Sequence, residues 1–126
     1  MRKRAIHAAE VLNEAPDYAT PTAFSRGMRV ELPGGGILLL LSGTASVGSD
    51  GRTVHPGDFR AQCWRTYRNL TRLLESERAS WGDVVRTTCY LRNIEHDYED
   101  FNEIRTQFFK EQGLNPLPAS TGIQAI

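Results

Sequence analysis

The stretch from Gly82 to Ile123 constrains the fold of this chain more than any other part of the sequence. Val84 to Arg92 is rich in valine, threonine and tyrosine, a composition that predicts a strand. Glu95 to Gln112 follows with apolar residues at helical spacing and a glycine directly behind it, which predicts a helix. Ala119 to Ile126 then begins a second strand. This order indicates a domain in which helices pack against a sheet.

The first half of the chain adds two strands and another helix. Phe24 to Leu32 alternates with a period of two, and Pro33 to Gly36 is a turn sequence, so a hairpin is predicted. Its second strand, Ile37 to Leu41, is a continuous apolar run of the kind found in central strands covered on both faces. Asp58 to Arg78 has helical periodicity, with Asp58 at the preferred capping position.

The predicted architecture is an α+β sandwich, with two helices packed on one face of a mixed β-sheet. Residues 1–20 show no period and are expected to form an N-terminal arm, and residues 21–126 are expected to form a single domain. The second face of Ile37 to Leu41 then needs a cover. Because an exposed apolar sheet is prone to association, we expect a homo-oligomer.

The charge balance limits the class of partner. Fifteen basic and fifteen acidic residues cancel, so no overall field attracts nucleic acid or an anionic membrane. The longest apolar run is five residues, Ile37 to Leu41, which is too short to span a bilayer. No secretory signal is visible near Met1. We therefore expect a soluble cytoplasmic protein that binds neither nucleic acid nor membrane.

Cysteine and histidine give no sign of a metal site or a cofactor. Cys63 and Cys89 lie in no metal-binding pattern and are expected to be small core residues. His7, His55 and His96 are scattered without the spacing of metal ligands and are expected at the surface. We expect no metal and no cofactor.

Five segments, in this order and spacing, resemble one protein family. They read PTAFSRG from Pro21, LLLLSGTAS from Leu38, DFRAQCWRTYRNLTRLLE from Asp58, DVVRTTCYL from Asp83 and LPASTGIQA from Leu117. The family is that of the Rid proteins, which are reactive intermediate deaminases also called YjgF-like or endoribonuclease L-PSP proteins. The resemblance implies a chorismate-mutase-like fold and a homotrimer with small-molecule clefts between adjacent subunits.

The resemblance also implies which residues line the cleft. Ser42 falls on a ligand-contacting serine, Asn102 falls on an asparagine near the cleft, and Phe24 stands where a tyrosine is usual. The remaining candidates follow the Pro-Ala pair near the end of the chain: Ser120, Thr121, Gly122 and Gln124. No catalytic residue is assigned.

Departures from the family pattern bear on the reaction. Deaminating Rid proteins carry an arginine where Ser120 stands, and it holds the carboxylate of a 2-imino acid. A serine in that place costs about 2–4 kcal/mol of binding free energy. Family members also continue into a closing strand with a glutamate that is thought to orient water. Here the domain is expected to end before that strand, at Ile126.

Some candidates have an alternative structural interpretation. Ser42 is also explained as a residue that satisfies a backbone group, and Asn102 as a buried polar group bonded to the next strand. Ser120 and Thr121 are also explained as strand residues at an interface. Five arginines are candidates to replace the missing clamp, and none is favoured over the others: Arg26, Arg29, Arg86, Arg92 and Arg105.

The sequence therefore leaves several functions open. The first is hydrolysis of an imine, enamine or vinylic metabolite, with uncharged or differently charged substrates preferred over imino acids. The second is a non-catalytic trimer that binds a metabolite for regulation. The third rests on the PASTGI segment, which resembles Rid-like domains of chorismatase-type enzymes that cleave an enolpyruvyl ether. RNA cleavage is disfavoured because no histidine pair or basic patch is apparent.

Overall fold

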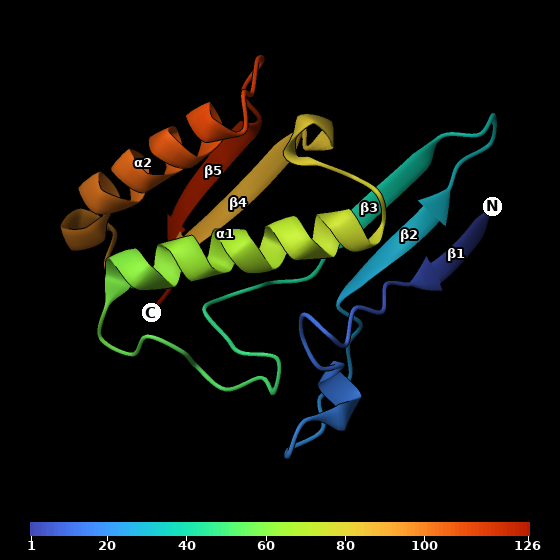
Figure 1. Cartoon of the computed structure of the whole chain (residues 1–126), viewed down its shortest axis with the longest axis horizontal. Coiled ribbons are helices and arrows are strands. Elements are labelled where there is room, and N and C mark those ends of the chain that lie inside the picture. The colour runs from blue at the N-terminus through green and yellow to red at the C-terminus, as the bar shows by residue number, and fades with distance from the viewer.

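Two helices lie on one side of two small sheets in the computed structural model, which describes residues 1–126 (Figure 1). In chain order the elements are β1 (Arg2–Ala5), a 3-10 turn (Ala15–Asp17), β2 (Gly27–Glu31), β3 (Ile37–Leu41), α1 (Phe59–Ser76), a 3-10 turn (Trp81–Asp83), β4 (Arg86–Leu91), α2 (Ile94–Glu111) and β5 (Ala119–Gln124).

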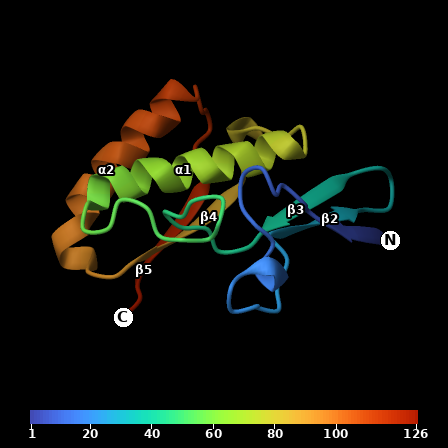
Figure 2. The ribbon, with the colours of Figure 1, turned by 60° about the horizontal axis from the view of Figure 1, so that its bottom comes forward.

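The strands form an antiparallel and a parallel sheet. β1, β2 and β3 pair antiparallel in that order, with Gly27 opposite Leu41. β4 and β5 pair parallel, with Thr87 beside Ser120. Both helices cover the same side of these strands, as the tilted view in Figure 2 also shows. The expected α+β class with two helices on one side is confirmed, but the strands form two separate sheets where one mixed sheet was predicted.

Both helices begin at a polar cap. The Asp58 carboxylate accepts a hydrogen bond from the backbone N–H of Ala61 at 3.0 Å, which satisfies an N–H that lacks a partner within the helix. The side-chain oxygen of Asn93 likewise accepts a hydrogen bond from the backbone N–H of His96 at 3.1 Å. Gly113, with φ of +67°, follows the end of α2 in the left-handed region that glycine enters without strain. The predicted helices are thus confirmed to within two residues at each end.

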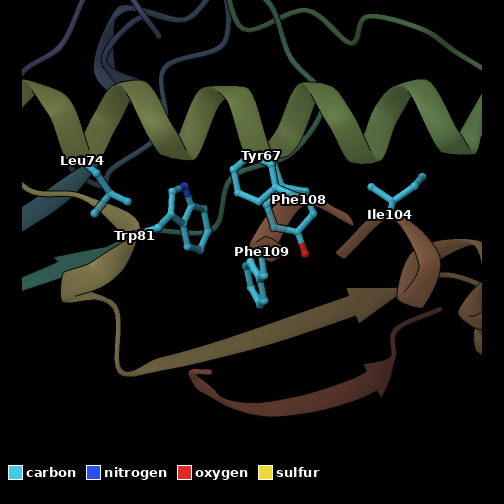
Figure 3. Close-up of a cluster of buried hydrophobic side chains, with 6 residues drawn as sticks. All are labelled: Tyr67, Leu74, Trp81, Ile104, Phe108 and Phe109. Atoms are coloured by element: carbon cyan, nitrogen blue, oxygen red, sulfur yellow. The ribbon is translucent and has the colours of Figure 1, made fainter. Parts of the chain in front are cut away.

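An aromatic cluster joins the two helices (Figure 3). Tyr67 of α1 stacks on Phe108 of α2 with ring centroids 4.5 Å apart, and Trp81 meets Phe108 edge to face at 5.3 Å. The indole N–H of Trp81 donates to the hydroxyl of Thr71 at 2.9 Å, so its polar atom is satisfied inside the core. This cluster fixes α1 and α2 relative to each other.

The N-terminal residues belong to the sheet and the core. β1 was not predicted, and Ile6, Ala8 and Leu12 are fully buried where an arm was expected. Arg4 of β1 donates two hydrogen bonds to the carboxylate of Glu77, at 2.8 and 2.7 Å. Leu73 of α1 shares a buried cluster with these N-terminal residues, so the segment packs on the helix.

One face of β3 is uncovered within the single chain, as expected from the helices lying on one side of the sheet. β3 pairs only with β2, and its second edge has no strand beside it. Leu39 and Leu41 are half-buried, whereas Leu38 and Leu40 on the opposite face are 43% and 54% exposed. The reason is that both helices lie on the same side, so no element of the chain covers the other.

We call this uncovered surface the bare face. Side chains alternate between the two faces along a strand, and paired residues of neighbouring strands lie on the same face. The strand pairing therefore decides which residues belong to the bare face. Its large apolar members are Met28, Val30, Leu38, Leu40, Tyr90 and Ile123.

Candidate functional site

Arg105 of α2 brings two of the predicted site residues together. Its guanidinium donates to the Ser120 hydroxyl at 3.2 Å and to the Asn102 side-chain oxygen at 2.8 Å. It also donates to the Tyr98 hydroxyl at 3.4 Å and lies 4.9 Å from the centroid of the Phe101 ring. We call these five residues the Arg105 cluster.

The cluster follows from helix and strand periodicity. Tyr98, Asn102 and Arg105 lie at positions i, i+4 and i+7 of α2, which places them on one face of the helix. Ser120 lies beside Thr87 of β4 in the parallel pair, and both side chains point toward the helices. The Thr87 hydroxyl oxygen is buried there without a hydrogen-bond partner. The cluster is therefore polar, and one neighbouring hydroxyl has its bonding capacity unused.

No carboxylate neutralises Arg105. All three acceptors of its hydrogen bonds are neutral, and it forms no ion pair. Arg60 of α1 shows the contrast, since its guanidinium lies 2.7 Å from an Asp100 oxygen and 3.2 Å from a Glu103 oxygen. The Arg105 cluster thus carries a net positive charge at a half-buried position.

The other candidates on β5 separate onto different surfaces. Thr121 points to the bare face, where its hydroxyl accepts a hydrogen bond from Arg86. Gln124 accepts a hydrogen bond from the backbone N–H of Ile94 at 3.0 Å, so its amide oxygen caps the start of α2. A Cβ placed on Gly122 meets no atom within 4 Å, which leaves open space two residues from Ser120.

Ser42 and Phe24 lie on the other half of the chain. The Ser42 hydroxyl donates to the backbone carbonyl of Ser25 at 2.5 Å, as its structural interpretation predicted. No hydrogen bond joins either residue to the Arg105 cluster, and β3 belongs to a different sheet from β5. A shallow hollow of about 230 Å³ lies beside Ser42, lined by Ser25, Gly27, Met28, Leu40, Leu41 and Ser42.

Of the five candidate arginines, Arg26, Arg86 and Arg105 contact predicted site residues. Arg26 is 3% exposed and lies 5.2 and 5.0 Å from the ring centroids of Tyr18 and Phe24. Its Nε–H donates to the Asn13 carbonyl at 3.0 Å, and burial lowers the pKa of its guanidinium. Arg29 lies 3.7 Å from a Glu77 oxygen. These two arginines hold the fold around β2.

Cys63 and the possible metal ligands bear on whether the chain holds a reactive site. Burial raises the pKa of the Cys63 thiol to about 11, so this cysteine stays protonated and unreactive near neutral pH. No group of three or more histidine, cysteine or acidic side chains is arranged to hold a metal ion. Neither helix is long and apolar enough to cross a membrane. The apolar periodicity of Glu95 to Gln112 predicted that Tyr98 faces the core, but Tyr98 is 43% exposed and accepts a hydrogen bond from Arg105.

Known proteins match both the sequence and the fold of this chain. The sequence profile of the endoribonuclease L-PSP family matches residues 14–126, which is nearly the whole chain. The chain belongs to this family. A RutC family protein of Pyrococcus abyssi is 29% identical over 76 residues, which is 60% of this chain and 59% of that protein. The matched stretch thus spans less than two thirds of this relative's length.

Solved structures of the Rid and YjgF-like group share the fold. The YjgF gene product of E. coli is 24% identical, with a TM-score of 0.73 over 97% of this chain and 85% of the other. Yeast Mmf1 is 15% identical, with a TM-score of 0.76 over 98% and 86%. E. coli TdcF, solved with bound serine, is 21% identical, with a TM-score of 0.75 over 97% and 85%. At these identities the likeness concerns the fold alone.

Proposed function

We propose that this Rid-family protein binds a small metabolite at the interfaces of a homotrimer and hydrolyses a C=N or vinylic bond in it. The observation that carries the proposal is the Arg105 cluster, in which Arg105 contacts both Asn102 and Ser120, and Ser120 lies two residues from the open space at Gly122. A metabolite-binding cleft needs polar groups that converge on open space, and this cluster supplies them.

The bare face supports the trimeric part of the proposal. Leu38, Leu40, Tyr90 and Ile123 are each more than two-fifths exposed on this surface, and a second copy of the chain would remove them from water. In such an assembly, Phe24 and the hollow at Ser42 come from one subunit and the Arg105 cluster from its neighbour. The cleft is then complete only between subunits.

Backbone geometry suggests how a C=N or vinylic group is polarised. The backbone N–H groups of Ala119 and Ala125 donate to the carbonyls of Val85 and Leu91. The backbone N–H groups of the odd-numbered residues of β5 therefore point toward β4. The direction of the backbone N–H alternates from one residue of a strand to the next. The N–H of Gly122, an even-numbered residue, therefore points to the free edge of β5. Because Gly122 has no Cβ, a ligand can approach its N–H. A hydrogen bond from this N–H would polarise the C=N or vinylic group to which water adds.

Non-catalytic binding is the alternative, and it too has an observation in its favour. The Arg105 cluster contains no carboxylate or histidine, so none of its members is a ready general acid or base near neutral pH. The same absence weakens the chorismatase-like alternative, which needs an acid to protonate a vinylic carbon. The bound serine of TdcF supports a small-molecule ligand under either scheme.

Hydrolysis of 2-iminopropionate, generated in situ by an amino acid oxidase, tests the proposal. We expect the purified chain to accelerate loss of the imine over buffer and over heat-denatured protein. Loss at the buffer rate, with saturable binding of small metabolites retained, would favour the non-catalytic alternative. Neither hydrolysis nor binding would refute both schemes.

A further inference from the structure

Arg26 is a buried cation without an ion-pair partner. The residue is 3% exposed, and its Nη2 atom is buried without a hydrogen-bond acceptor. Glu14, the carboxylate that acts on it electrostatically, forms its own ion pair with His7 at 3.3 Å. A desolvated charge and an unsatisfied donor both oppose folding, so an apolar side chain would suit the interior better. The position of Arg26 therefore calls for a role besides stability.

The guanidinium of Arg26 lies against two aromatic rings. Its central carbon is 5.2 Å from the ring centroid of Tyr18 and 5.0 Å from that of Phe24, which is within the range of cation–π contacts. The Nε–H donates to the Asn13 carbonyl at 3.0 Å and so helps to fix the plane of the group. Phe24 is 38% exposed, so part of its ring remains free to contact a ligand.

The backbone of Arg26 is bonded to the second candidate site residue of this half of the chain. The Arg26 carbonyl accepts a hydrogen bond from the Ser42 N–H at 3.0 Å. The Ser42 hydroxyl donates to the carbonyl of the preceding residue, Ser25, at 2.5 Å. Arg26 thus contacts Phe24 through its side chain and Ser42 through its backbone.

We propose that Arg26 is a positioning residue that holds the Phe24 ring as a wall of the ligand cleft. This inference rests on the function proposed above. Arg26 is itself too buried to reach a ligand, so it acts through the ring that it contacts. A wall that is held in place before the ligand arrives loses less side-chain entropy on binding.

The contacts continue from Tyr18 to a surface loop. A Cβ placed on Gly51 would lie 2.8 Å from Cε1 of Tyr18, so the ring packs where only a glycine leaves room for it. Asn13 belongs to the same N-terminal segment, and its N–H donates to the Ser49 carbonyl of this loop at 2.8 Å. A displacement of Tyr18 is therefore expected to reach the cleft wall through Arg26.

The position of the ring is measured with Phe24→Trp, whose indole acrylamide quenches. An indole keeps the cation–π contact, and the native chain gives the background of Trp64 and Trp81. Added to Phe24→Trp, Arg26→Met removes the charge and the flat group, whereas Arg26→Lys keeps the charge alone. We expect both to raise the quenching of the introduced indole, Arg26→Met more strongly. Arg68→Met, at an exposed position of α1, is the matched control and should leave it unchanged.

Gly51→Ala tests the same contacts while Arg26 stays in place, and it decides the question if Arg26→Met does not fold. The added methyl group displaces Tyr18, so the quenching of the introduced indole should again rise. Gly57→Ala is the matched control. Gly57 has φ of +78°, close to the +83° of Gly51, but its Cβ would meet no atom within 4 Å. It adds similar backbone strain without the clash and should leave the quenching unchanged.

Steady-state kinetics separate positioning from a purely structural role. With Phe24 intact, Arg26→Met should raise KM for 2-iminopropionate roughly 3- to 10-fold and leave kcat within about twofold, because an aromatic contact to the ligand is weakened. If Arg26 only stabilises the fold, the same change lowers the urea midpoint and leaves KM and kcat of the folded protein unchanged.

Unchanged quenching in Arg26→Met or in Gly51→Ala would overturn the inference. An unchanged KM in Arg26→Met, despite stronger quenching, would overturn it as well. Absence of hydrolysis by the native chain would instead refute the catalytic function proposed above. The quenching of the introduced indole would then decide by itself whether Arg26 holds the ring at position 24.

Discussion

Gln124 shows how a polar side chain at an expected ligand site is already engaged by the fold. Its amide oxygen lies 3.0 Å from the backbone nitrogen of Ile94 and satisfies an N–H in the first turn of α2. Ser42 is engaged in the same way with the Ser25 carbonyl. Both side chains can still contact a ligand, but their observed partners lie in the backbone.

Replacing Gln124 by alanine should therefore lower the free energy of unfolding by about 0.5–1.5 kcal/mol and leave the hydrolysis of 2-iminopropionate unchanged. Gln124→Glu is the control, since it keeps an acceptor and adds a negative charge near the start of α2, where the helix dipole favours it. Urea unfolding of both variants measures the effect. A slower hydrolysis in Gln124→Ala at unchanged stability would show that Gln124 belongs to the cleft.

At the scale of elements, the contact between α1 and α2 depends on one aromatic cluster. Phe108 meets four other rings, those of Trp64, Tyr67, Trp81 and Phe109, at centroid distances of 6.2, 4.5, 5.3 and 6.1 Å. Because α2 also carries Arg105, this packing positions the cluster as well as the core.

Phe108→Ala should lower the free energy of unfolding by about 3–5 kcal/mol, since it removes a buried ring and leaves a cavity. Phe108→Leu retains more of the volume and should cost clearly less. Thr106→Ala, at an exposed position of the same helix, is the control and should change stability by less than about 0.5 kcal/mol. Chemical denaturation measures all three. A loss below about 1 kcal/mol in Phe108→Ala would mean that the cluster does not hold the helices together.

The sequence predicted the elements whose signals are local. α1 and α2 have apolar residues at helical spacing and polar caps, and all of these lie within each segment. β1 has the sequence Arg-Lys-Arg-Ala, with no apolar alternation. Its place is fixed by pairing with β2 and by the contact between Arg4 and Glu77, which are 73 residues apart. No pattern within residues 1–20 contains that information.

The candidate site was predictable in part for the same reason. Family motifs pointed to Asn102 and Ser120, which the structure brings together. They gave no preference among five arginines, because the choice depends on which face of α2 lies beside β5. That relation is a property of the packed chain and has no local sequence signal.

At the scale of the whole molecule, the bare face gives the last prediction. Leu40 is 54% exposed there, opposite Met28 of β2, on a surface that no element of the chain covers. We expect light scattering to give the mass of a trimer for the native chain. Leu40→Glu should shift it to monomer, because a buried, unpaired carboxylate opposes assembly.

Ile37→Glu is the matched control for this experiment. Ile37 lies on the same strand with 51% exposure, but its side chain points to the face that carries the helices. The glutamate stays in water there, and the trimer should persist. A native chain that is a monodisperse monomer would contradict the assembly, and with it a cleft completed by two subunits. A trimer that tolerates Leu40→Glu would mean that the subunits meet through another surface.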